Sequence, residues 1–250
     1  MTDFASPPLP RWRSTHLLWI GGLLFALLAA GLMAVGAIIA LNDPQAAASG
    51  DVPLTLGFTL GATAVQALAF LLPVGLVGWW VGIDWRTAVG WRNPTAYWWG
   101  MALLLGLLCI PVTGLIATYT QELLAYEEIY NPQLDFVVPE GFSWLAFIGM
   151  TLTVGLLIPV AEELVFRGVL LTWLAAHVPG WAAVLVTSLI FAAMHVEPSI
   201  VAGTLFLGLV CGWLVQKSGS LWPAIAVHVL NNAVKVVILY LALLLDIPLV

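Results

Sequence analysis

The chain has 250 residues, of which 62% are hydrophobic and only 8% are charged, whereas a soluble globular domain carries roughly a quarter charged residues. This composition excludes an ordinary soluble domain. The formal net charge is −6 and there is no basic patch, so we do not expect nucleic-acid binding, which depends on clustered Lys and Arg. The two cysteines, Cys109 and Cys211, both lie in apolar segments, which argues against a disulfide framework and against a cysteine-based zinc site.

The dominant feature of the sequence is a series of apolar stretches separated by short polar breaks. A helix that crosses a bilayer needs about 20 mostly apolar residues. We therefore predict an all-α fold, a polytopic transmembrane helical bundle of about seven spans, within a range of roughly six to eight. The predicted spans are Leu17–Leu41, Pro53–Gly82, Tyr97–Thr118, Phe142–Val160, Trp181–Val196, Ser199–Gln216 and Leu221–Leu245. They leave almost nothing for a soluble domain, so we expect one integrated membrane domain with an N-terminal set of helices, 1–141, and a C-terminal set, 142–250.

The cations of the chain predict how the helices are oriented. The first apolar run is longer than the 7–15 residues of a signal peptide, so we interpret it as a retained span. Lys and Arg collect in cytoplasmic loops. With a cytoplasmic N-terminus, the residues that fall on or near that side are Arg11, Arg13, Arg86, Arg92, Arg167 and Lys217. The sequence therefore predicts an integral multi-pass protein of the plasma membrane with its N-terminus in the cytoplasm.

Several ionisable or strongly polar residues lie inside the predicted C-terminal spans or at their ends. An ionisable residue there costs about 2.5–3.5 kcal/mol on insertion scales, so each one calls for a partner or a function. The residues are Glu162, Glu163, Arg167, His195, His228, Asn231, Asn232 and Lys235, with Glu197 just past the fifth span. This half of the chain is therefore the candidate for a functional site.

Helical spacing divides these residues into two roles. Residues four apart share a face of a helix, while consecutive residues point about 100° apart. Glu163 therefore faces Arg167, and we expect these two residues to form a structural ion pair. Glu162 points elsewhere and is left for a cavity, while His228 shares a face with Asn232.

Distances along the helices predict which groups lie at the same depth. Glu162 and His195 each lie roughly 16 residues, or about 24 Å, from the turn at 177–180, so an antiparallel hairpin puts them side by side. His228 lies only about 14 Å past the next turn, and it reaches the same level only if the first hairpin projects about 10 Å further. Glu197 and Lys235 also lie at similar depths, and we expect a buried ion pair between them.

These groups allow two related chemistries. Glu162, His195 and His228 could hold a metal such as Zn²⁺, with a water in the open position. Alternatively, Glu162 and His195 could activate a water directly, while His228 and Asn232 donate hydrogen bonds to a developing oxyanion. Residue types and spacing are compatible with both.

Three motifs in this half of the chain resemble those of a known family. The segments Glu162-Glu163-Leu164-Val165-Phe166-Arg167, Phe191-Ala192-Ala193-Met194-His195 and His228-Val229-Leu230-Asn231-Asn232 look like the patterns EExxxR, FxxxH and HxxxN of the CPBP family. That family groups the CAAX prenyl proteases of the Ras-converting type with bacterial bacteriocin-processing and immunity proteins, often called Abi. The resemblance implies an intramembrane endopeptidase of the metallo- or glutamate type. In it, Glu162 and His195 would activate water, and His228 and Asn232 would stabilise the oxyanion.

Three classes of function are open to such a chain. The first is a peptidase that cleaves a peptide or protein substrate, lipidated or not, near the cytoplasmic side of the lipid bilayer. The second is a non-catalytic protein that gives self-immunity to a bacteriocin or acts as a membrane scaffold. The third is a transporter whose buried carboxylate and histidine relay protons. The complete set of four groups favours catalysis over a scaffold, and the lack of an internal repeat argues against a transporter.

Overall fold

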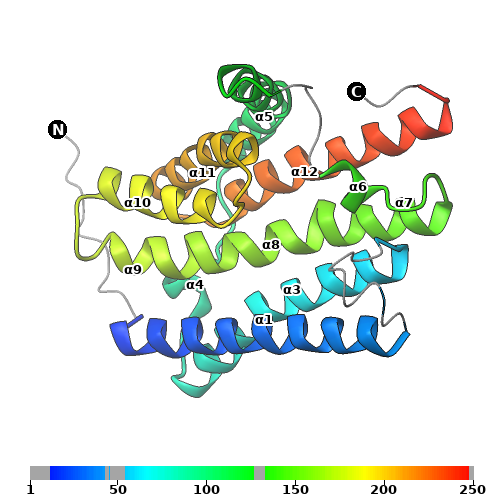
Figure 1. Ribbon diagram of the computed structural model, residues 1–250. Helices are drawn as coiled ribbons and strands as arrows, with labels where there is room; N and C mark the ends of the chain where they lie inside the picture. Colours follow the sequence, from blue (N-terminus) through cyan, green and yellow to red (C-terminus); the bar gives the residue numbers. More distant parts are fainter. Residues whose placement is uncertain (1–11, 43–44, 46–53, 127–132, 248–250) are drawn as a thin grey trace.

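The protein is a bundle of helices in the computed structural model, which describes residues 12–42, 45, 54–126 and 133–247 (Figure 1). The helices are α1 (Ser14–Asn42), α3 (Leu56–Trp80), α4 (Trp85–Ala88), α5 (Ala96–Leu123), α6 (Leu134–Val137), α7 (Trp144–Met150), η1 (Thr151–Leu157), α8 (Ile158–Glu163), η2 (Leu164–Leu171), α9 (Thr172–Leu174), α10 (Gly180–Ala193), α11 (Pro198–Ser218) and α12 (Trp222–Leu244). Within the described residues, 6 helices are long and apolar enough to cross a membrane, and α10 is a shorter apolar helix. The predicted all-α bundle of about seven spans is confirmed.

The fourth span differs from the prediction, which ended it at Val160. Elements α7, η1, α8, η2 and α9 form one continuous helix of 31 residues, Trp144–Leu174. The sequence suggested an end near Glu162 because charged residues usually mark the boundary of a span. Here Glu163 and Arg167 are paired inside the bundle, so the helix continues past them and Glu162 lies in its interior.

The fifth predicted span is shorter than expected and forms a hairpin with the sixth. Helix α10 has 14 residues, or about 21 Å at 1.5 Å per residue, and Figure 1 shows it beginning beside α9 and ending part-way along the bundle. The chain then turns through Val196, whose φ is 61°, and α11 returns. At the base of the hairpin, Gln216 Nε2 donates to the Gly180 carbonyl at 2.7 Å.

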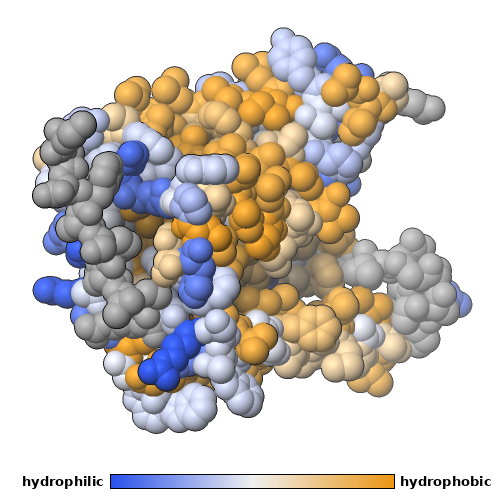
Figure 2. All heavy atoms as spheres, turned by 90° about the vertical axis from the view of Figure 1, so that its left-hand side faces the viewer, coloured by the Kyte–Doolittle hydropathy of each residue, from blue (hydrophilic) through white to orange (hydrophobic). Residues whose placement is uncertain are grey.

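Polar loops meet at one end of the bundle, which we call the basic end. The Leu221 amide donates to the Gly90 carbonyl at 2.9 Å, and Trp12 Nε1 donates to the Ala88 carbonyl at 3.2 Å. Among the described cations, those at this end are Arg13, Arg86, Arg92 and Lys217. Figure 2, which faces this end, shows hydrophilic residues beside a broad hydrophobic area. These four described cations therefore lie at the same end of the bundle.

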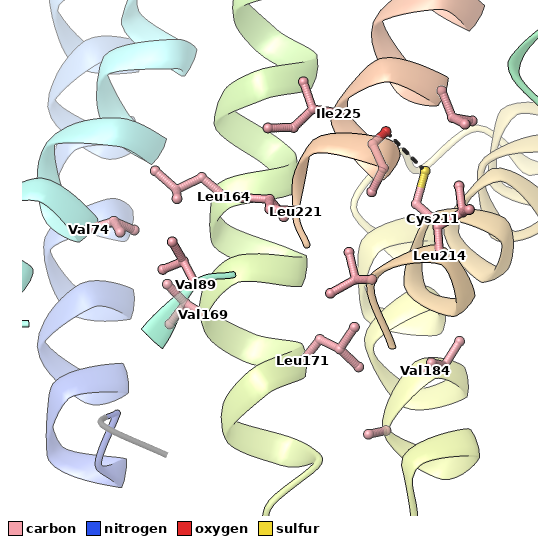
Figure 3. Packing of buried hydrophobic residues seen from close by; sticks show 14 of the residues in the cluster. Val74, Val89, Leu164, Val169, Leu171, Val184, Cys211, Leu214, Leu221 and Ile225 are labelled. Atoms are coloured by element: carbon pink, nitrogen blue, oxygen red, sulfur yellow. Dashed lines mark hydrogen bonds between the residues drawn. The ribbon is translucent and has the colours of Figure 1, made fainter. Parts of the chain in front are cut away.

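The main core lies where η2, α10, α11 and α12 pack together (Figure 3). Small residues on α11 allow this approach: a Cβ added at Gly212 would lie 2.9 Å from Val184 Cγ1 on α10. Cys211 Sγ donates to the Ala224 carbonyl of α12 at 3.7 Å. Both cysteines are free and buried, so they serve as packing residues. Helix α1 lies at the edge of the bundle (Figure 1), and Ile20 is its one buried residue among those described.

Replacing Gly212 by Leu should loosen the α10–α11 hairpin. Val184 is stiff at χ1 and cannot move away, so we expect an overpacking penalty of about 1–3 kcal/mol. The matched control is Gly61→Leu, because a Cβ at Gly61 meets nothing within 4 Å and both changes add the same helix-favouring side chain. Thermal unfolding in detergent measures the effect. Equal unfolding midpoints for the two variants would contradict this account of the packing.

Candidate active site

Glu162 is buried in the middle of the bundle, with 6% of its surface exposed. It projects from α8, and two groups from other helices approach its carboxylate. Gln66 Nε2, on α3, donates to Glu162 Oε1 at 3.4 Å. His228 Nε2, on α12, lies 3.7 Å from Glu162 Oε2. The carboxylate therefore has an amide on one side and an imidazole on the other.

Glu163 connects the predicted ion pair to His228. Arg167 Nη1 donates to Glu163 Oε1 at 2.9 Å, and His228 Nδ1 lies at 2.9 Å from the same oxygen. Because a carboxylate only accepts, Nδ1 carries the proton and Nε2 is directed toward Glu162. The sequence argument had kept Glu163 and Arg167 apart from the cavity groups, whereas Glu163 orients one of those groups directly.

Arg167 is fully buried and contacts its own helix and two others, α10 and α11. Besides its bond to Glu163, its Nη2 donates to the Gly208 carbonyl on α11 at 3.0 Å. Its guanidinium carbon lies 4.5 Å from the ring centroid of Phe191 on α10. A guanidinium presents five donors in a rigid plane and also stacks on aromatic rings, so Arg suits this position better than Lys.

His195 lies just past the end of α10 and is half-buried. Its Nδ1 lies 3.1 Å from the Phe191 carbonyl. A carbonyl can only accept, so Nδ1 donates, and the neutral ring keeps its lone pair on Nε2. The Phe191 ring packs edge-on against both His195 and His228, with centroids 5.1 and 5.7 Å away. One aromatic residue therefore separates the two imidazoles and helps to hold both.

A cavity of about 350 Å³ brings Glu162 and His195 together. Gln66 is the third polar residue of its wall, and the rest of the wall is apolar. The apolar residues are Leu28, Gly31, Leu32 and Val35 on α1, Phe58, Ala62, Val65 and Phe70 on α3, and Phe166, Phe191 and Met194. Neither His228 nor Asn232 is among the described residues that line this cavity. Two of the four predicted catalytic residues thus face the cavity directly, and His228 reaches it through Glu162.

From the sequence, His228 reaches the depth of Glu162 only if the first hairpin projects further than the start of the last helix, and the structure meets this condition. Figure 1 shows the turn between α9 and α10 extending well beyond the start of α12. The first hairpin projects further than α12, and His228 lies level with Glu162 as a result.

Asn232 lies one turn along α12 from His228 and is half-buried. Its Nδ2 is 3.5 Å from the Val154 carbonyl, at the limit of a hydrogen bond. Its Oδ1 accepts from Asn231 Nδ2 at 2.9 Å. The amide group of Asn232 is thus held mainly through its oxygen.

The predicted ion pair between Glu197 and Lys235 is wrong. Glu197 caps the N-terminus of α11, where it accepts from the Ile200 amide at 2.9 Å, from Ser199 Oγ and from Tyr126 Oη at 2.9 Å. Lys235 Nζ instead donates to Thr113 Oγ1 at 2.7 Å. The depth argument overlooked the capping role that the turn after α10 gives to Glu197. Partial burial raises the pKa of this carboxyl, but the hydrogen bonds from Ser199, Ile200 and Tyr126 outweigh burial and hold the pKa below its usual value.

The residues expected to hold Zn²⁺ have suitable donor chemistry, with one carboxylate and two imidazoles. Within the described part of the chain, however, no group of three or more His, Cys, Asp or Glu is arranged to hold a metal ion. We therefore derive no step through a metal.

The comparison with known proteins indicates a family for the C-terminal part of the chain. A family model described as type II CAAX prenyl endopeptidase Rce1-like matches residues 144–234. This match supports membership of the CPBP family of CAAX proteases. A protease family implies peptide or protein substrates and lipid surroundings, and together with the apolar helices it supports an integral multi-pass membrane protein. No curated protein and no solved structure matched the chain.

The matched region contains all four predicted catalytic residues but not Gln66. The sequence argument missed Gln66 because it concentrated on ionisable residues in the C-terminal half. The available signal was a single side-chain amide inside the apolar segment that forms α3. Such an amide requires a partner in a membrane, and here the partner is Glu162.

Replacing Arg167 by Met should destabilise the whole bundle, because it leaves the Glu163 carboxylate buried without its cation. Removing one partner of a buried pair typically costs about 3–5 kcal/mol. The matched control is Lys217→Met, which removes an exposed cation at the basic end. Thermal unfolding of purified protein in detergent measures both. If Arg167→Met and the control have the same unfolding midpoint, the Glu163–Arg167 pair does not stabilise the folded bundle.

Proposed function

We propose that this protein is an intramembrane endopeptidase that hydrolyses a peptide bond near the cytoplasmic side of the membrane. The observation that carries the proposal is the cavity in which a buried carboxylate, Glu162, and an imidazole, His195, face a common apolar space. A partly open apolar space of this kind admits a hydrophobic segment of a substrate. A carboxylate and an imidazole can activate a water molecule there.

In the proposed reaction, the oxygen of water attacks the carbonyl carbon of the scissile bond. Glu162, with His195 beside it, takes one proton from that water as the C–O bond forms. When the C–N bond of the peptide breaks, the same proton passes to the nitrogen of the leaving amine. The negative charge that develops on the carbonyl oxygen is stabilised by donors from His228 and Asn232. Glu163 accepts from Nδ1 of His228 and so directs Nε2 toward Glu162, and His228 donates from Nε2 in this role when both ring nitrogens carry a proton.

The proposal also includes the orientation of the protein. Arg13, Arg86, Arg92 and Lys217 lie at the basic end. The described chain also begins there, because Trp12 donates to the Ala88 carbonyl. Lys and Arg collect on the cytoplasmic side of membrane proteins. We therefore assign the basic end and the N-terminus to the cytoplasm, in the plasma membrane.

Glu162→Gln should abolish cleavage while it preserves the fold. Loss of a general acid–base group lowers the rate by about 10²–10⁴-fold. The assay uses detergent-purified protein and a panel of quenched peptides, with and without a prenylated cysteine. Glu122→Gln is the matched control, since this carboxylate is exposed at the end of α5.

Each arm of that assay is run with and without a chelator, which distinguishes metal-dependent from glutamate chemistry. Unchanged cleavage by Glu162→Gln would contradict the role of Glu162. Absence of cleavage by the unmodified protein on every peptide would overturn the peptidase and favour the non-catalytic scaffold.

Gln66→Leu should lower cleavage by roughly tenfold or more, because a hydrogen bond to a charged group is worth about 1.5–3 kcal/mol. Leu fills nearly the same volume but cannot orient the Glu162 carboxylate. The control is Thr172→Val, whose hydroxyl bonds only to carbonyls of its own helix, those of Gly168 and Val169. Full activity of Gln66→Leu would show that the amide is a bystander.

A further inference from the structure

We infer that Lys235, Thr113 and Asn231 form a hydrogen-bonded chain that positions Asn232 and strengthens it as an oxyanion donor. The inference rests on the proposed function, in which Asn232 stabilises the oxyanion. It adds three positioning residues to that site, and one of them comes from the N-terminal half of the protein.

Lys235 is the starting point because its environment is otherwise unexplained. It lies inside the apolar helix α12, where a cation costs about 2.5–3.5 kcal/mol on insertion scales. In the described part of the chain, no carboxylate forms an ion pair with it. Its Nζ instead donates to the hydroxyl of Thr113 on α5, at 2.7 Å. Lys235 is half-buried, and a cation in an apolar helix that binds a neutral hydroxyl is a costly arrangement unless its charge acts on something beyond the hydroxyl.

The next contacts lead from Thr113 to Asn232. The Thr113 hydroxyl lies 3.2 Å from Asn231 Oδ1, and it also lies 2.7 Å from the Cys109 carbonyl and 3.3 Å from the Ile110 carbonyl. Its single proton is shared among these three acceptors. Asn231 Nδ2 then donates to Asn232 Oδ1 at 2.9 Å. Donors therefore point in one direction along the whole chain, from the ammonium group of Lys235 to the amide of Asn232.

This direction has two physical consequences for Asn232. First, Asn231 fixes which end of the Asn232 amide faces Val154: a flipped amide would place two NH₂ groups together and an oxygen against the Val154 carbonyl. Second, hydrogen bonds in a chain polarise one another, and a positive charge at the start makes the last N–H a better donor. The Asn232 Nδ2 group makes only a 3.5 Å contact with Val154, so it keeps donor capacity for a developing oxyanion.

The chain also explains why the site needs α5. The family match begins at Trp144, so Thr113 lies outside it. Asn231 is 3% exposed and Thr113 is 5% exposed. The contact between α5 and α12 is therefore closed to solvent and can hold the polar groups in one geometry.

The test compares Thr113→Val, which is isosteric and lacks the hydroxyl, with Thr113→Ser, which restores it. We expect Thr113→Val and Lys235→Met each to lower kcat about tenfold with KM changed less than about twofold, because the chain acts only on the transition state. Thr113→Ser should stay within about twofold of the unmodified protein. Thr204→Val is the control, since its hydroxyl bonds only to carbonyls of its own helix.

A double-mutant cycle separates positioning from general stability. In an Asn232→Ala background, Thr113→Val and Lys235→Met should cause no further loss of kcat, whereas losses from a loosened fold would add. Three results would each overturn the inference. They are a wild-type kcat in both single variants, equal losses of kcat in Thr113→Val and Thr113→Ser, and additive losses in the cycle. In those cases Glu162-dependent cleavage would still support the peptidase. If the unmodified protein cleaves nothing, the proposed function and this inference fail together.

Discussion

The structure depends on one buried carboxylate oxygen, Oε1 of Glu163, which is shared by Arg167 and His228. In a bilayer, a charge must be paired inside the protein because there is no water to solvate it. The Glu163–Arg167 pair meets this requirement and also connects the central helix to α11, through the Gly208 carbonyl, and to α10, through Phe191. Because His228 uses the same oxygen, the group that holds the helices together also orients an imidazole of the candidate site.

The central helix presents two consecutive glutamates to different surroundings, and its geometry explains how. Wider π-helical turns, η1 and η2, lie directly before and after α8. Each π turn adds a residue to the hydrogen-bonded ring and shifts the phase of the following side chains, and such turns are frequent at functional sites. Pro159 follows η1 and lacks the N–H that a regular helix would use there. Glu162 then faces α3 and the cavity, while Glu163 faces Arg167 and α12.

Sequence reasoning predicted the helical class, the set of polar residues and the Glu163–Arg167 contact, because these follow from hydropathy and from local spacing along one helix. It did not predict the partners that come from distant helices. Gln66 and Thr113 each lie in a long apolar segment with no ionisable neighbour, and only the packing of α3 and α5 shows what they contact. The Glu197–Lys235 pair failed for a related reason. Positions along two helices predict which groups lie at the same depth, but they do not show whether those groups face each other. Glu197 instead caps α11, where it accepts a hydrogen bond from the Ile200 amide.

The contribution of the N-terminal helices follows from the walls of the cavity. The groups proposed to act on the substrate come from the region that matches the family model, but most of the apolar lining comes from α1 and α3. Helix α1 approaches α3 closely at the cavity, where a Cβ on Gly31 would lie 2.3 Å from Val65 Cγ1. The width of the cavity at this point is therefore controlled by a contact between two helices that carry none of the four predicted catalytic residues. Side-chain changes on α1 and α3 can alter which hydrophobic segment fits while they leave Glu162 and His195 in place. The chemistry and the selection of substrates thus depend on different parts of the chain, joined at Glu162 by the hydrogen bond from Gln66.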